Sequence, residues 1–442
     1  MKRLLLLGHL VLFLVTFLLT ATRAQATITL VEKDSWRFST SGFVEMDAIM
    51  DTTRSFSESQ GNTPVQRQDI TAGKTGRAIF SVRNSRLAFD VDAPKINTWA
   101  SSARFEFDFL GFNPDPSVGS NNENAFMTSP TFRARMLYVE SKNDDGWSAL
   151  VGQYWSLFGW QPYYFASHAD VVPLAGAVNA RNAQLRGMKT FEVGSGDTLQ
   201  LAVAASRPPQ RDAQFPAVDG GLRATFGSRK SGYTTSTAGP RALRQLSIGL
   251  SGTMREFETP RTGGNVGEVS YFPGLAMALD AFIPVWAAAP DSADVGNTVS
   301  LLLEGTTGRG YGDLFPSWSG NLSTNAGGGN LDAGIGGQDS LGNFRLIELR
   351  SASGSLQYQL PDAWQTWFSV GYGQIYSTNA GLFVGGNNLK VYTRDESYFV
   401  NTFHDLASCL RVGLEYTFTS TSYTDGPVAH NHRFQLGTWF TF

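Results

Sequence analysis

The chain of 442 residues is poor in cysteine, in charge and in long apolar segments. Cys409 is the only cysteine, so no disulfide can form within the chain, and we expect its side chain to be a small buried filler. Charged residues make up 17%, well below the quarter that is usual for soluble domains. The best candidate for a membrane helix, residues 274–290, carries Asp280 and Pro284 and is shorter than the roughly 20 apolar residues required. Disulfide scaffolds and helical membrane bundles are therefore excluded.

The first 26 residues are typical of an export signal. Lys2 and Arg3 precede an apolar run over residues 4–21, and Ala24-Gln25-Ala26 offers a small-x-small cleavage site. An uncleaved anchor helix is the alternative. Cleavage removes three of the 35 basic residues and none of the 38 acidic ones, which leaves a net charge of −6 on residues 27–442. A mildly acidic exported chain argues against nucleic acid as a partner.

Aromatic residues are abundant and alternate with polar ones. Phe105 and Phe107 would lie on one face of a strand, opposite Arg104 and Glu106, and residues 411–418 repeat the pattern. Over residues 131–140, we expect Phe132, Ala134, Met136 and Tyr138 to share the apolar face. Lipid permits strands only as a closed barrel with apolar residues outside and polar residues inside. A soluble sandwich is the alternative, but the density of Phe and Tyr favours an all-β transmembrane antiparallel barrel with a wide, wet lumen.

Connection lengths predict the number of strands. Outer-membrane barrels alternate short periplasmic turns with long external loops, so eight long connections imply sixteen strands. Residues 227–244 should form a short turn yet run long, which leaves a miscount of one hairpin open. We expect residues 307–343, with a Gly and Asn run at 325–330, to form a flexible external surface. The eight long connections are residues 52–76, 111–131, 155–183, 206–219, 257–273, 307–343, 377–393 and 420–431.

The last residues have the pattern of a closing strand. Phe434, Leu436, Phe440 and Phe442 fall on one face, and the chain ends on an aromatic residue. With an even number of strands both ends lie in the periplasm, where Phe442 would be the signal that barrel-assembly machinery recognises. We therefore expect the outer membrane of a Gram-negative cell as the location and its lipid as a partner. Trp439 is unusual because it falls on the lumen face.

Three segments carry a resemblance to a known family. Residues 83–91 ("RNSRLAFDV"), 150–160 ("LVGQYWSLFGW") and 179–187 ("NARNAQLRG") resemble segments of the DcaP-like trimeric porins, which are related to general bacterial porins. Residues 41–51 are similar to the family's first strand. The resemblance implies a 16-stranded homotrimer that passes small acidic solutes such as dicarboxylates. Some relatives begin with a periplasmic coiled coil, for which residues 27–34 are too short.

An arginine row is the predicted constriction. The alternation slips by one residue between residues 78–82 and 87–91, so a β-bulge near Asn84 and Ser85 would aim Arg83 and Arg86 inward. Guanidinium groups stay charged and bind carboxylates through two parallel hydrogen bonds, which suits selection of anions. Pairing with Glu106 and Asp108, without any selection, is the alternative. The row consists of Arg83, Arg86, Arg104, Arg133 and Arg135.

The third external loop contains residues that would be costly in water. Phe158, Trp160 and residues 163–165 are aromatic, so we expect the loop to fold into the barrel and to narrow the lumen. His168 and Asp170 are its polar members most able to face the arginines. Arg181 and Arg186, which follow the loop, could extend the positive wall.

No enzymatic or metal motif is evident, and we expect no catalytic residue, metal or cofactor. His430 and His432 could share a metal on one strand face, but no third ligand is evident. The predicted function is passive diffusion of small hydrophilic solutes, with mono- and dicarboxylates favoured. A porin for sugars or aromatic solutes is the main alternative, because the loop aromatics could line a path for rings. An outer-membrane barrel enzyme and an adhesin are the remaining ones.

Overall fold

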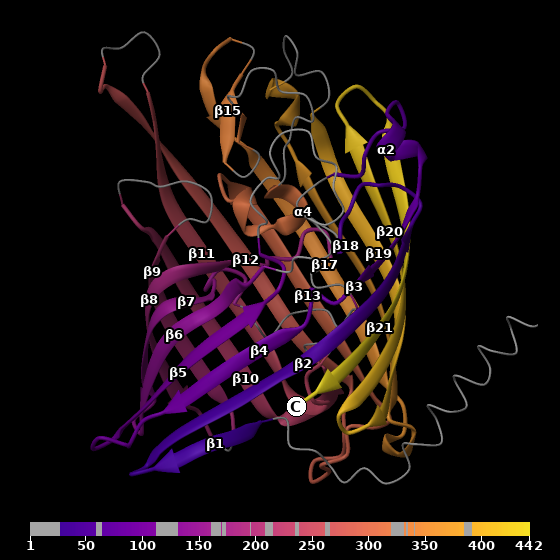
Figure 1. Ribbon diagram of the computed structural model, residues 1–442. Helices are drawn as coiled ribbons and strands as arrows, with labels where there is room; N and C mark the ends of the chain where they lie inside the picture. The colour runs from indigo at the N-terminus through magenta and orange to yellow at the C-terminus, as the bar shows by residue number, and fades with distance from the viewer. Residues whose placement is uncertain are drawn as a thin grey trace, which may run out of the picture.

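One closed antiparallel barrel dominates the computed structural model (Figure 1). The structure describes residues 27–58, 64–111, 131–160, 169, 174–194, 196–207, 215–234, 238–260, 266–319, 331–332, 335–339, 341–383 and 391–442. The expected signal, residues 1–26, lies outside the described residues. Among the described helices, none has the length and apolar character needed to span a membrane.

Sixteen strands form the wall, as the connection lengths predict. The main sheet has 18 strands, of which β1 (Ile28–Lys33) only forms an antiparallel hairpin with the first residues of β2, while β3 and β4 are two halves of one strand. In order, the wall consists of β2 (Trp36–Asp51), β3 (Arg77–Ser81) with β4 (Arg86–Asp92), β5 (Trp99–Asp108), β6 (Arg133–Asn143), β7 (Trp147–Trp155), β8 (Arg181–Glu192), β9 (Thr198–Ser206), β10 (Ala217–Tyr233), β11 (Ala242–Pro260), β12 (Val269–Trp286), β13 (Thr298–Arg309), β17 (Glu348–Gln359), β18 (Thr366–Ser377), β19 (Tyr392–Ala407), β20 (Leu410–Tyr423) and β21 (Val428–Thr441).

The last strand closes the barrel against the first. β2 pairs with β21 from Phe43 opposite Thr441 to Asp51 opposite Arg433. Phe442 extends this ladder, because its N–H and its carbonyl both hydrogen-bond the backbone of Gly42. Residues 434–442 therefore belong to the closing strand, and the start of β2 and the end of β21 lie at the same end of the barrel (Figure 1).

The two faces of the strands differ as lipid and lumen require. On β21, Phe434, Leu436 and Phe440 are each at least 50% exposed on the outer surface, whereas Arg433 and Trp439 are buried inside. The same alternation places Phe80, Val203 and Met277 outside on other strands. Because apolar side chains cover the exterior while charged ones point inward, the protein is an outer-membrane barrel rather than a sandwich in water.

β6 contains a shift that the sequence pattern did not reveal. Its pairing with β5 skips Arg135, so the residues that follow change face. Leu137 and Val139 are exposed outside, while the Tyr138 ring lies 4.8 Å from the ring of Tyr154 on the lumen side. The prediction that Met136 and Tyr138 share the apolar face with Phe132 was wrong: Met136 is buried opposite Glu106, because this bulge turns the second half of the strand over.

Residues 227–244 do not conceal an additional hairpin. β10 continues to Tyr233, β11 begins at Ala242, and their pairing resumes after residues 227–229, which are skipped. The long connection is thus the bent tip of one hairpin, and the count of sixteen strands stands.

External loops pack together above the lumen. In the loop between β13 and β17, η1 (Gly312–Leu314) and α4 (Pro316–Ser319) bury Tyr311, Phe315 and Trp318 completely. The Tyr392 hydroxyl donates a hydrogen bond of 2.7 Å to the Trp318 carbonyl. The expectation of a flexible external surface was wrong for residues 310–319, because their aromatic side chains find an apolar cluster. The Gly and Asn run at 325–330 lies outside the described residues.

Other short elements decorate the two rims. On the external side, the Arg67 guanidinium lies 2.5 Å from the Asp425 carboxylate, which joins the first loop to the last and raises the pKa of Arg67. These short elements are α2 (Thr71–Lys74), β14 (Leu331–Asp332), β15 (Gly336–Gln338), β16 (Phe344–Leu346), η2 (Asp362–Trp364) and η3 (Ala380–Phe383).

Candidate functional site

The interruption between β3 and β4 confirms the predicted irregularity. β2 pairs first with β3 and then with β4, so residues 82–85 lie outside the ladder. The Asn84 amide donates to Asp47 Oδ2 at 2.7 Å, and the Glu45 N–H donates to Ser85 Oγ at 2.9 Å. These polar contacts hold the bulge against the first strand.

Arg83 reaches toward external loops and not toward the other predicted arginines. Its Nη1 lies 3.0 Å from Glu58 Oε1 in the loop after β2. Its side chain also donates to the carbonyls of Phe109 and Gly111 in the loop after β5. Arg83 therefore braces two loops.

Two arginines of β6 share the carboxylates of β5. Arg135 Nε lies 2.8 Å from Glu106 Oε1, and its Nη1 lies 2.8 Å from Asp108 Oδ2. Arg133 Nη2 approaches Asp108 Oδ2 to 2.5 Å. The side chains of Arg135, Glu106 and Asp108 are at most 7% exposed, so these charges depend on one another for compensation.

Two more arginines surround Glu106. Arg104 Nη2 lies 3.0 Å from Glu106 Oε2, and its Nη1 lies 2.8 Å from Asp90. Arg86 Nε lies 3.6 Å from Glu106 Oε1. Glu106 and Asp108 together thus bind four guanidinium groups. Pairing of the arginines with Glu106 and Asp108 was the predicted alternative to anion selection. Even with this pairing, the wall holds more arginines than carboxylates.

Arg181 and Arg186 extend this wall without a carboxylate of their own. The Arg181 guanidinium lies 4.9 Å from the centre of the Trp155 ring and interacts electrostatically with Arg135. Arg186 donates to the Trp155 carbonyl at 2.6 Å and to Gln184 at 2.9 Å. Within the part of the chain that the structure describes, neither arginine forms an ion pair. Asp108 acts electrostatically on Arg181, and Glu140 and Asp219 act on Arg186, so the compensation of these two arginines comes from carboxylates without direct contact.

A first lumen cavity of 280 Å³ adjoins Arg186. Tyr154 and Trp160 contribute rings to its lining, and the Arg223 guanidinium lies 5.1 Å from the centre of the Trp160 ring. Lys142, Arg186 and Arg223 bring positive charge to this cavity, and Glu140 brings a negative one. It therefore combines cations with aromatic surface.

A second cavity, of 370 Å³, continues along the same wall and shares Gln200 and Arg223 with the first. Arg223, Lys230 and Arg244 line it, and no described acidic residue does. The two cavities together carry five cationic side chains and one carboxylate. This basic wall runs over β6, β8, β10 and β11.

The third external loop, residues 156–180, is tied to acidic residues on other strands. The Val178 N–H donates to Glu304 Oε1 of β13 at 2.6 Å. The Ala169 N–H donates to Glu415 Oε2 of β20 at 2.7 Å. Backbone donors of the loop therefore already bind the carboxylates of Glu304 and Glu415.

Hydrogen bonds to uncharged residues also hold the third loop against the wall. The Ala175 N–H donates to Ser397 Oγ at 2.9 Å, and the Gly159 N–H donates to Ser251 Oγ at 3.0 Å. At Gly373 of β18, a Cβ would lie 2.1 Å from the Ala175 carbonyl, so only glycine allows this approach. Residues 161–168 and 170–173, including His168 and Asp170, lie outside the described residues, so the full course of the loop stays a prediction.

Several lumen residues escaped the sequence reading. Lys142, Arg223, Lys230 and Arg244 were not among the predicted constriction residues. Arg223 could have been found, because it alternates with Leu222, which is 41% exposed on the outer surface. Lys230 and Arg244 lie within residues 227–244, where no alternation indicates a face. Cys409 is not the predicted buried filler, since it is half-buried and lines a cavity at the periplasmic end.

The histidines of β21 have aromatic partners. His432 Nδ1 lies 2.8 Å from the Tyr416 hydroxyl, and the His430 ring stacks on Phe418 at 5.4 Å. The described residues contain no group of His, Cys, Asp and Glu able to hold a metal ion. Because of these contacts, His430 and His432 belong to the outer aromatic surface of the barrel.

Comparisons with known proteins agree on the architecture. No protein-family model and no curated protein matches the sequence. Among solved structures, the outer membrane channel DcaP of Acinetobacter baumannii matches with a TM-score of 0.64 and 14% identity, over 94% of this chain and 100% of that chain. OmpT of Vibrio cholerae matches with a TM-score of 0.50 and 10% identity, over 94% and 99% of the two chains.

OprB of Pseudomonas putida matches with a TM-score of 0.50 and 11% identity, over 91% of this chain and 94% of that chain. The resemblance that the sequence carries toward DcaP-like porins is thereby confirmed at the level of fold. With sixteen strands, an apolar exterior and a charged lumen, this chain has the fold of the outer-membrane porins.

Proposed function

We propose that the protein is a passive diffusion channel that favours small organic anions, chiefly mono- and dicarboxylates. The observation that carries this proposal is the basic wall, where two adjoining cavities present five cationic side chains and one carboxylate. The net charge of −6 on residues 27–442 would favour cations. Local charge outweighs it, because a narrow passage focuses the field while distant exposed charges are screened beyond about 8–10 Å.

Four lumen carboxylates are already engaged by other groups. The carboxylates of Glu106 and Asp108 are shared by four arginines, and Glu304 and Glu415 accept hydrogen bonds from the third loop. Among the described residues, Arg181 and Arg186 form no direct ion pair and interact only with more distant carboxylates. An anion that enters along this wall therefore meets guanidinium groups able to bind a carboxylate. We further propose that the third loop crosses the lumen and directs solutes to this wall.

A planar-bilayer measurement in a salt gradient tests the proposal. The wild-type reversal potential should indicate preference for anions over cations. Arg181→Gln combined with Arg186→Gln should shift it toward cations and reduce dicarboxylate flux, while the folded barrel persists because no carboxylate loses its partner. Arg37→Gln, which removes an exposed arginine paired with Asp92, is the matched control. A cation-selective wild type would refute anion selection.

A channel for ring-bearing solutes is the second candidate. Tyr154 and Trp160 line the first cavity beside Arg186, so a solute with a ring could pack there. Swelling of liposomes in sugars, aromatic acids and aliphatic dicarboxylates of similar size separates the two candidates. Faster entry of aromatic acids than of dicarboxylates would favour this second function.

We also propose a homotrimer, as the resemblance to trimeric porins implies. The exported chain should migrate as a trimer in native electrophoresis and dissociate on heating. A protein that stays monomeric in mild detergent would contradict this assembly, without bearing on the anion preference of a single barrel.

A further inference from the structure

The tip of the β10–β11 hairpin leaves the barrel wall at its periplasmic end. We call residues 230–234 and 238–244 the strap. The Gly232 N–H donates to Thr298 Oγ1 of β13 at 2.8 Å, and the Thr234 N–H donates to Gln357 Oε1 of β17 at 3.0 Å. Neither β13 nor β17 pairs with β10 or β11. Residues 227–229 interrupt the pairing, so the hairpin bends there and its tip reaches buried, inward-facing side chains of β13 and β17.

The described far part of the strap reaches strands well around the barrel. Ala238 packs against a buried aromatic cluster that includes Trp367 of β18 and Trp439 of β21. The Gly239 carbonyl accepts a hydrogen bond of 3.0 Å from Arg411 Nη1 of β20. This cluster explains why Trp439 faces the lumen. The strap therefore bridges the mouth from β10 to β20.

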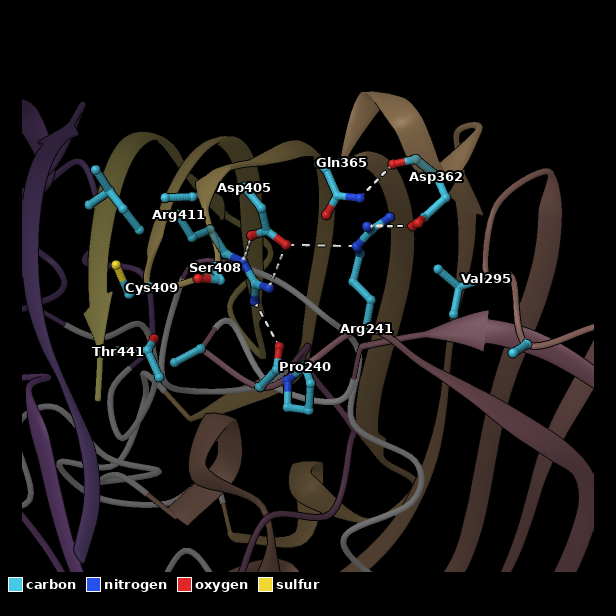
Figure 2. A pocket seen from close by; sticks show the side chains of 15 residues that line it. Pro240, Arg241, Val295, Asp362, Gln365, Asp405, Ser408, Cys409, Arg411 and Thr441 are labelled. Atoms are coloured by element: carbon cyan, nitrogen blue, oxygen red, sulfur yellow. Dashed lines mark hydrogen bonds and ion pairs between the residues drawn. The ribbon is translucent and has the colours of Figure 1, made fainter. Parts of the chain in front are cut away.

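Ion pairs fasten the strap to the opposite strands (Figure 2). Arg241 Nη2 lies 2.7 Å from Asp362 Oδ1, and its Nε lies 3.7 Å from Asp405 Oδ2. Arg411 Nε lies 2.6 Å from Asp405 Oδ1. The side chains of Arg241 and Arg411 are 7% and 9% exposed. Four charges thus form one continuous latch, of which the two arginines are buried and Asp362 is exposed.

A cavity of 430 Å³ lies against this latch. Arg241 and Arg411 line it together with Ser408, Cys409 and Thr441, as Figure 2 shows. The Nη1 atom of Arg241 is buried and has no hydrogen-bond partner among the described residues. Because Arg241 lines the cavity, a small rotation of its side chain would turn this unpaired nitrogen toward an oxygen of a passing anion.

We propose that the strap is a second narrowing of the solute path and that the departing anion binds Arg241 in the cavity of Figure 2. The proposal rests on the proposed function, since it takes the lumen as the path of an anionic solute. The chemistry at this exit suits a carboxylate or an inorganic anion, because Arg241 offers the free donor while Asp362 and Asp405 hold its other nitrogens in place.

The native thiol of Cys409 supplies the first test. Purified protein in planar bilayers is treated, one side at a time, with a negatively charged ethylsulfonate or a positively charged ethyltrimethylammonium methanethiosulfonate. Reagent on the periplasmic side should lower single-channel conductance, and the sulfonate should lower anion current more. Cys409→Ser should be insensitive to both, and mass spectrometry confirms the labelling. A labelled channel with unchanged conductance would overturn the exit path.

The second test opens the latch. Arg241→Met should raise single-channel conductance and admit larger neutral sugars in liposome swelling, because both ion pairs of the strap are lost. Arg229→Met is the matched control on the same hairpin, since Arg229 bonds only the carbonyls of Pro284 and Val285 among the described residues. An Arg241→Met channel that is folded, with wild-type conductance and size limit, would refute the narrowing.

These readouts stay separate from the anion proposal. Conductance and size limit report the strap whichever ion is preferred, whereas reversal potential reports the basic wall. Equal falls in anion current with both thiol reagents would retain the narrowing and overturn anion binding at Arg241.

Discussion

The lumen arginines differ in how much charge on neighbouring carboxylates their removal would leave without compensation. Arg135 touches both Glu106 and Asp108 with its side chain 5% exposed, whereas the Arg133 side chain is 36% exposed and touches Asp108 alone. Removing one partner of a buried ion pair costs far more than removing an exposed one, because a charge is left without compensation. Arginines of one row therefore serve structure and transport to different extents.

Arg135→Met should destabilise the barrel by about 3 kcal/mol, since two buried carboxylates lose a donor. Arg133→Met should cost about 1 kcal/mol or less, because water reaches that side chain. The temperature at which the folded band converts to the unfolded band in electrophoresis measures both variants. If Arg133→Met lowered this temperature as much as Arg135→Met, the burial argument would fail.

Replacing Arg133 and Arg135 together by Ala should also alter selectivity. Glu106 and Asp108 would then keep only Arg86 and Arg104 as partners, so the wall would lose its local excess of positive charge. The reversal potential should move toward cations and dicarboxylate flux should fall. Cation selectivity both before and after the change would mean that the arginines only neutralise the carboxylates.

The position of Trp160 in the third loop requires a glycine at residue 221 of β10. A Cβ built at Gly221 would lie 2.0 Å from the Trp160 ring, whereas one built at neighbouring Gly220 meets nothing within 4 Å. Gly221→Val should push Trp160 into the first cavity and lower single-channel conductance. Gly220→Val, with the same loss of a glycine, should conduct like the wild type. Equal conductance in both variants would show that Trp160 does not border the path.

How far the sequence predicts an element depends on how strongly its faces differ. Strands such as β21 were predictable, because Phe and Leu alternate with polar residues and lipid enforces the alternation. The bulge in β6, after which the residues change face, could not be predicted, since Met136 and Tyr138 are compatible with either face. The strap was not, since Ser, Thr and Gly dominate residues 231–239. Which arginines lack a carboxylate depends on register, and only the structure supplies it.

For the whole molecule, the terminal ring is predicted to control assembly. Phe442→Ser keeps the backbone hydrogen bonds to Gly42 but removes the ring that packs beside that glycine. The amount of barrel assembled in the outer membrane should fall, while export to the periplasm continues. Phe442→Tyr should assemble normally. Cell fractionation combined with heat-modifiable electrophoresis measures both, and normal assembly of Phe442→Ser would refute the signal.

With the strap in place, the barrel should carry more ion current in one direction than in the other. The two cavities of the basic wall, where cations predominate, lie toward the periplasmic end, since Gly146, Thr198 and the strap residue Lys230 line them. On the external side, by contrast, Arg67 is balanced by Asp425. A pore with fixed charge distributed unevenly along its axis accumulates mobile ions under one polarity and depletes them under the other. An oriented channel in symmetric salt should therefore show current rectification. The difference between the two polarities should decrease as rising ionic strength screens the charges of the basic wall.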